Sequence, residues 1–148
     1  MKRIITVLFL VLSTVAFSQK VKFKKDKVII DDVEMYNYDR EGFMTTFSTL
    51  SSQEFMSVLI TQYQTRNESY YQMKDPEKYS ISPYKTENVF TVKFLQSGKE
   101  MFTQMSDKEV IKAFFKANLM DENGKIDEEK LDVFITKYNN ENLKLKIK

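Results

Sequence analysis

The sequence predicts an α+β fold, in which a twisted antiparallel sheet of about five to seven strands carries a C-terminal two-helix hairpin on one face. Several short segments alternate apolar and polar residues, which is typical of half-buried strands. Residues 106–139 contain two runs with helical spacing, joined by a polar turn. The last six residues, 143–148, alternate again and predict a final edge strand whose lysines prevent aggregation.

The first eighteen residues have the features of a cleaved secretory signal peptide. Lys2 and Arg3 precede an apolar run at 4–17, and small residues at 16 and 18 suit signal peptidase. The run is shorter than the roughly 20 residues of a spanning helix. No Cys follows it, which argues against a lipoprotein anchor. We expect cleavage before Gln19, leaving 19–148 as a single exported domain without a transmembrane segment, periplasmic or extracellular.

The amino-terminal segment also carries a resemblance in style. It combines Lys2-Arg3, the ending Ala16-Phe17-Ser18-Gln19 and a lysine-rich strand to Lys24. In these features it resembles small exported proteins of Bacteroidota-type bacteria. The resemblance implies a Gram-negative periplasm or exterior, and it supplies no site residue.

The composition excludes several classes of chemistry. The chain has no Cys and no His, so Ser-His-Asp and Cys-His nucleophile systems and the usual zinc sites are absent. Three glycines, widely separated, cannot form a phosphate-binding loop. Removing Lys2 and Arg3 leaves 21 basic residues (23 minus 2) against 21 acidic ones, a formal net charge of zero. The sequence therefore predicts no cofactor and no nucleic-acid partner.

The first half of the chain is predicted to form strands. Residues 20–24 alternate, and 28–38 reads as a hairpin around Asp31-Asp32, because Asp tolerates the backbone of tight turns. Residues 43–50 alternate again. The segment 51–65 has two interpretations: Ser51-x-x-Glu54 suits a helical capping box, whereas its branched and aromatic residues favour a central strand. We favour the strand.

The middle of the chain contains one segment without a clear period, at 66–86, which predicts a long functional or mobile loop. It is followed by a hairpin, with strands at 87–95 and 101–104 and Ser97-Gly98 at the turn.

Two helices follow. Ser106-x-x-Glu109 predicts a capping box for the first, and Asp127 a cap for the second. Apolar residues at helical spacing mark the faces expected to be buried. These are Val110, Ile111, Phe114, Phe115 and Leu119 on the first helix, and Leu131, Phe134, Ile135 and Tyr138 on the second.

Two sets of residues are candidates for binding. The tyrosines of the 66–86 loop offer wide contact surfaces with polar tips, as in recognition loops, although they are equally suited to pack back on the sheet. Six lysines would form one basic face if the first and last strands share a sheet, although solvated edges explain them as well. The candidates are Tyr70, Tyr71, Tyr79 and Tyr84, with Lys20, Lys22, Lys24, Lys144, Lys146 and Lys148.

The turn Asp121-Glu122-Asn123-Gly124 resembles part of an EF-hand calcium loop. With Gly124 at the sixth loop position, Leu119 and Lys130 occupy the first and twelfth, where Asp and a bidentate Glu are required. A polar turn with a helix cap explains the same residues, so no metal site is predicted.

These observations predict a small, non-catalytic, exported binding module for an unknown protein or glycan of the cell envelope. The alternative is a hydrolase that acts on an envelope or extracellular polymer through carboxylates. Two carboxyl groups facing each other across a deep cleft would favour the hydrolase, and an exposed surface dominated by the tyrosine loop would favour the module.

Overall fold

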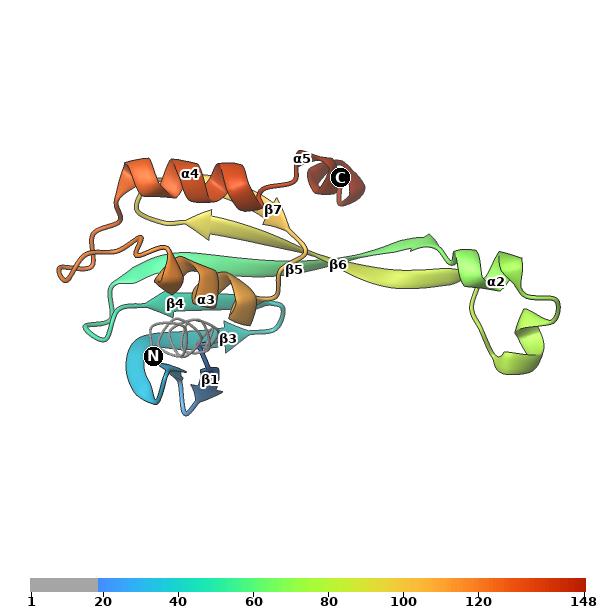
Figure 1. Cartoon of the computed structure of the whole chain (residues 1–148), viewed down its shortest axis with the longest axis horizontal. Coiled ribbons are helices and arrows are strands. Elements are labelled where there is room, and N and C mark those ends of the chain that lie inside the picture. Colours follow the sequence, from blue (N-terminus) through green and yellow to red (C-terminus); the bar gives the residue numbers. More distant parts are fainter. Residues whose placement is uncertain (1–18) are drawn as a thin grey trace, which may run out of the picture.

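The computed structural model describes residues 19–148, and the predicted signal peptide lies outside them. The chain forms a body of sheet and helices from which one long hairpin projects (Figure 1). The elements in chain order are β1 (Val21–Lys24), β2 (Lys27–Ile30), β3 (Val33–Glu41), β4 (Met44–Ser48), β5 (Glu54–Arg66), α2 (Glu68–Gln72), the 3-10 helix η1 (Pro76–Tyr79), β6 (Tyr84–Phe94), β7 (Glu100–Thr103), α3 (Asp107–Lys116), α4 (Glu128–Tyr138) and α5 (Glu141–Lys146).

The seven strands form one antiparallel sheet whose spatial order is the sequence order, β1 to β7. The predicted α+β class and the twisted sheet are confirmed. The segment 51–65 is a strand, as favoured, because β5 lies between β4 and β6 and buries Phe55, Met56 and Val58. The capping-box alternative at Ser51 is wrong, since the chain is extended from Glu54.

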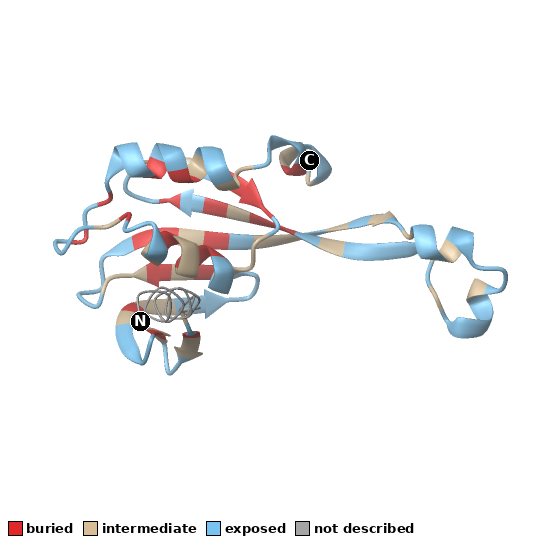
Figure 2. Cartoon of the chain, in the orientation of Figure 1, coloured by how far each residue is buried: buried red, intermediate tan, exposed pale blue. Residues whose placement is uncertain are grey.

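Helices α3 and α4 cover one face of the sheet, and the buried residues gather between them and the strands (Figure 2). Phe114 of α3 lies at the centre. Its ring centroid is 5.1 Å from that of Phe55, 6.3 Å from that of Tyr36 and 6.5 Å from that of Phe94. One helical side chain therefore joins β3, β5 and β6.

The helix ends follow the predicted capping. The Ser106 hydroxyl accepts from the Glu109 N–H, and the Glu109 carboxylate accepts from the Ser106 N–H at 2.8 Å. The Ser106 hydroxyl also donates to the Glu109 carboxylate at 2.8 Å. The two hydrogen bonds that the carboxylate accepts, from the backbone and the side chain of Ser106, hold the pKa of Glu109 below its usual value. Asp127 caps α4 by accepting from the Lys130 N–H at 3.1 Å.

The predicted final edge strand is wrong, because 141–146 forms the short helix α5. In a helix, Leu143 and Ile147 fall on one side, four residues apart, and pack against Val89 and Phe102. Leu145 points outward and is 71% exposed. In so short a segment, alternating Leu and Lys is compatible with a strand and with a helix. The helix forms because it brings Leu143 and Ile147 to the same side, where both pack against the body.

The 66–86 segment is not a structureless loop. Strands β5 and β6 pair continuously to Arg66 and Tyr84, whereas β4 pairs with β5 only as far as Leu59 and β7 with β6 only from Phe90. The two strands therefore continue alone as a two-stranded ribbon of six residue pairs, about 20 Å long at 3.3 Å per residue. We call the ribbon and the turn at its end, 61–89, the arm (Figure 1).

No helix within residues 19–148 has the length and apolar character needed to span a membrane.

Candidate functional site

The arm is held at its root by the C-terminal helix. Tyr63 packs with Val89, Phe102 and Leu143 in a small apolar cluster. The Tyr63 hydroxyl donates to the Glu87 carboxylate at 2.6 Å, and Lys146 lies over the Tyr63 ring at 5.2 Å. Hydrogen bonds from Lys85 and Tyr63 lower the pKa of Glu87. These contacts fix the direction in which the arm leaves the body.

The end of the arm, 67–83, contains α2 and η1 and has no buried residue (Figure 2). We call this segment the tip. Its ends are joined by hydrogen bonds from the Asn67 N–H to the Pro83 carbonyl, 2.9 Å, and from the Asn67 side chain to the Ser82 carbonyl, 2.8 Å. The tip is thus closed by hydrogen bonds between its own two ends.

The four candidate tyrosines lie on the tip and at the adjoining start of β6. Tyr70 and Tyr71 belong to α2, with ring centroids 5.1 Å apart. Tyr79 ends η1 and Tyr84 begins β6. The exposed fractions are 48% for Tyr71, 63% for Tyr79 and 57% for Tyr84, so none of these three packs back on the sheet. The Arg66 guanidinium lies 3.9 Å from the centre of the Tyr71 ring and stiffens that side chain.

The six lysines do not form one face. Lys20, Lys22 and Lys24 lie in or beside β1, whereas the other three belong to the segment that packs near β7. Six strand spacings of about 4.8 Å separate those edges by roughly 29 Å. Lys22 forms an ion pair with Asp32, 2.6 Å, and Lys144 with Glu100, 3.6 Å. Anion binding by either group stays a prediction.

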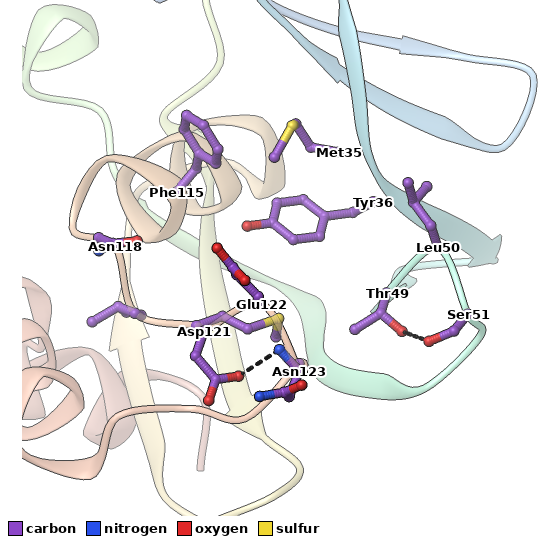
Figure 3. Close-up of a pocket in the computed structure, with 13 residues that line it drawn as sticks. Met35, Tyr36, Thr49, Leu50, Ser51, Phe115, Asn118, Asp121, Glu122 and Asn123 are labelled. Carbon is purple, nitrogen blue, oxygen red and sulfur yellow. Dashed lines mark hydrogen bonds between the residues drawn. The ribbon is translucent and has the colours of Figure 1, made fainter.

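A second candidate site is a pocket of about 480 Å³ at the opposite end of the body from the arm (Figure 3). One wall comes from β3 and the β4–β5 turn. The other comes from the end of α3 and the α3–α4 loop. The lining residues are Met35, Tyr36, Thr49, Leu50, Ser51, Phe115, Asn118, Leu119, Met120, Asp121, Glu122, Asn123 and Gly124.

The α3–α4 loop is held in a fixed shape. The Asp121 carboxylate accepts from the backbone N–H groups of Asn123 and Lys125, each at 2.9 Å. The Gln96 side chain donates to the Gly124 carbonyl at 2.7 Å and accepts from the Ile126 N–H at 3.0 Å. The Asp121 carboxylate therefore organises a turn. Residues 19–148 contain no cluster of three or more acidic side chains placed to hold a metal ion.

The pocket does not have the geometry of a glycosidase site. Its two carboxylates, Asp121 and Glu122, are neighbours on the same wall, and the facing wall from β3 and the β4–β5 turn supplies Tyr36, Thr49 and Ser51. Carboxylate pairs for sugar hydrolysis flank the bond that is cleaved.

Tyr36 is one of the pocket residues that the sequence did not indicate. It is 8% exposed, its ring lies 5.2 Å from that of Phe55, and its hydroxyl points into the pocket (Figure 3). Burial raises the pKa of Tyr36 to about 12, so the hydroxyl stays protonated. In the sequence, Tyr36 was one more aromatic residue of a predicted strand, and no local pattern distinguished it.

No protein-family model, curated protein or solved structure matches this chain.

Proposed function

We propose that this protein is a small exported interaction module, and that the tip of the arm is the surface that contacts its partner. The observation that carries the proposal is that 67–83 contains no buried residue, yet presents tyrosine rings about 20 Å beyond the neighbouring strands. Such a segment adds little to the stability of the body, so a role in recognition explains its length and its composition.

The physical cost of the arm supports this interpretation. A two-stranded hairpin on its own is at best marginally stable in water. Here the root contacts of Tyr63 and Val89 anchor the ribbon. Tyr and Thr along its strands favour extended backbone. The sequence of the ribbon therefore suits an exposed, extended element.

The chemistry of the tip suits a protein or glycan surface. Tyrosine gives a large contact area at little entropic cost, because its ring is rigid and its hydroxyl forms hydrogen bonds. Met73, 43% exposed, adds an adaptable apolar side chain beside these rings. Basic and acidic residues alternate around them, with Arg66 paired to Glu68 at 3.2 Å, so the tip has no strong charge of either sign.

A capture experiment tests the proposal. The purified protein is immobilised and incubated with a native envelope fraction and, separately, with envelope polysaccharide. A variant with Ser at 70, 71, 79 and 84 is compared with the parent protein. We expect the variant to lose most of the material that the parent captures, with an unchanged melting temperature. Capture of protein or of polysaccharide identifies the partner class.

The matched control replaces two exposed apolar residues of the body, Val133→Ser and Leu145→Ser, which are 70% and 71% exposed. This double variant should capture as much as the parent. Equal capture by the tyrosine variant, or a lowered melting temperature in that variant, would contradict the proposal and identify the tyrosines as structural.

A further inference from the structure

We propose that the pocket between β3 and the α3–α4 loop is a binding site for a small amine with an apolar body. This inference is independent of the arm, since the pocket lies at the other end of the body. It depends on the unpaired hydroxyl of a buried tyrosine that opens onto the pocket, an unpaired carboxylate at the rim, and apolar walls that are already formed.

The hydroxyl of Tyr36 is the first observation. A tyrosine can bury its ring while its hydroxyl stays accessible for hydrogen bonding. Tyr36 is 8% exposed, and within residues 19–148 its hydroxyl has no hydrogen-bond partner; it points into the pocket instead (Figure 3). The rings of Phe55 and Phe114 hold its orientation. This accessible hydroxyl is available to form a hydrogen bond with a polar group of a ligand in the pocket.

The charge of the pocket is the second observation. Its lining contains two carboxylates, Asp121 and Glu122, and neither Lys nor Arg. Asp121 is engaged by backbone N–H groups, whereas Glu122 is exposed and has no ion-pair or hydrogen-bond partner among the described residues. A cationic ligand would be attracted to this rim, and an anionic one repelled.

The apolar walls are the third observation. Four apolar side chains, Met35, Leu50, Phe115 and Met120, also line the pocket. The volume of about 480 Å³ lies in the range of small-molecule pockets. An ammonium group at Glu122 and the Tyr36 oxygen, with a ring or short chain against the methionines, satisfies all three features.

The walls do not need to move to form this site. The Gln96 side chain fixes the α3–α4 loop, and Gly124 lies close against Thr49 and Gln53 of the opposite wall. A pre-formed pocket avoids the free-energy cost of ordering its walls on binding.

Three probes of matched shape test the inference: phenethylamine, phenethyl alcohol and 3-phenylpropionate. Each is titrated at millimolar concentration into the 15N-labelled protein while amide shifts are recorded. We expect phenethylamine to shift the amides of Leu50, Asn123 and Gly124, the alcohol to bind more weakly, and the anion most weakly. Absence of localised shifts with the amine, or equal binding of the anion, would overturn the inference.

Variants separate the contributions. Tyr36→Phe and Glu122→Gln should each weaken phenethylamine binding by about tenfold, the effect of losing one hydrogen bond or ion pair to a charged group. Tyr79→Phe and Glu77→Gln make the same chemical changes on the tip and should leave binding unchanged. Leu50→Arg, at a position 52% exposed, introduces a cation at the mouth without disturbing the core and should abolish binding. Unchanged binding in Leu50→Arg would overturn the inference even if Tyr36→Phe failed to fold.

Discussion

The backbone N–H of Phe102 donates a hydrogen bond to the side-chain oxygen of Asn139 at 2.8 Å. The next residue, Asn140, donates its own N–H to the Phe102 carbonyl at 2.8 Å. The chain leaving α4 thereby pairs with edge strand β7 and passes to the other face of the sheet, where α5 packs. Residues 139–140 therefore cover the edge of β7 and also direct α5 to the place where it anchors the arm.

We expect Asn139→Ala to lower the free energy of unfolding by about 1 to 2 kcal/mol, because the partly buried Phe102 N–H loses its acceptor. Denaturant unfolding measures the change, and faster hydrogen exchange of the Phe102 amide locates it. The control is Asn142→Ala, a nearby exposed Asn whose backbone N–H, but not its side chain, forms a hydrogen bond among the described residues. An equal effect of both substitutions would contradict this account of the edge.

The C-terminal helix predicts different effects for two neighbouring leucines. Leu143→Ala should lower the free energy of unfolding by about 2 kcal/mol, because Leu143 is 3% exposed and packs on Val89 and Phe102. Leu145→Ala should change it by less than about 0.5 kcal/mol, since Leu145 lies on the exposed side. Equal losses would indicate that 143–148 is a strand with both leucines on one face.

Gly124 and Gly98 provide a matched pair. Both have positive φ angles, +78° and +70°. A Cβ at Gly98 meets nothing within 4 Å, whereas one at Gly124 lies 3.0 Å from the Thr49 methyl group and 3.1 Å from the Gln53 side chain. Gly98→Ala should lower the free energy of unfolding by about 1 kcal/mol, because a residue with a Cβ is strained at this positive φ. Gly124→Ala should lower the free energy of unfolding by at least about 1 kcal/mol more, because its Cβ is also too close to Thr49 and Gln53.

Thermal unfolding of the two glycine variants measures this difference. A chemical-shift comparison shows whether Gly124→Ala also moves the Thr49 wall of the pocket. Equal melting temperatures would mean that the pocket wall at Thr49 and Gln53 moves away from residue 124 without a loss of stability.

Removing the tip should leave the body folded. We expect a chain in which 67–83 is replaced by Asn-Gly, a sequence that favours tight hairpin turns, to melt within a few degrees of the parent. The reason is that none of the deleted residues is buried and the root contact between Tyr63 and Glu87 remains. A large fall in melting temperature would assign the tip a structural role and weaken the case for recognition.

The Tyr36 phenol predicts a loss of stability at high pH. Below pH 10 both the folded and unfolded states keep its proton. Between pH 10 and about 12 the unfolded state loses the proton first, because burial raises the pKa in the folded state, so the unfolding free energy falls. The fall attributable to Tyr36 is about 2 to 3 kcal/mol, at about 1.4 kcal/mol per pKa unit.

The comparison with Tyr36→Phe isolates this contribution from the lysines and other tyrosines that titrate in the same range. The difference in unfolding free energy between the two proteins should change with pH above 10 and be constant below it. A difference that stays constant through pH 12 would indicate an unperturbed phenol.

The elements that the sequence predicted correctly are those whose pattern is local, either repeated along several residues or contained within one helical turn. The alternation of Phe90, Val92 and Phe94 gave a strand because all three meet the same core, and the reciprocal bonds of Ser106 and Glu109 act within one helical turn. Leu143 was misassigned because its partners, Val89 and Phe102, are distant in sequence and decide between two local patterns.

The same reasoning explains what was missed at the candidate sites. The 67–83 segment showed no period because none of its residues faces a core, and the arm beneath it follows from where β4 and β7 stop pairing. The pocket joins Tyr36 to Glu122 across a distance in sequence that no motif spans.

The order of strands in the sheet has a consequence for how the chain folds. Each strand pairs with the strand that precedes it, and every connection except the tip, 67–83, is a short loop whose closure has a small entropic cost. Such local connectivity favours rapid folding. Phe114, which touches rings from β3, β5 and β6, is then the side chain that joins the finished hairpins into one cooperative unit.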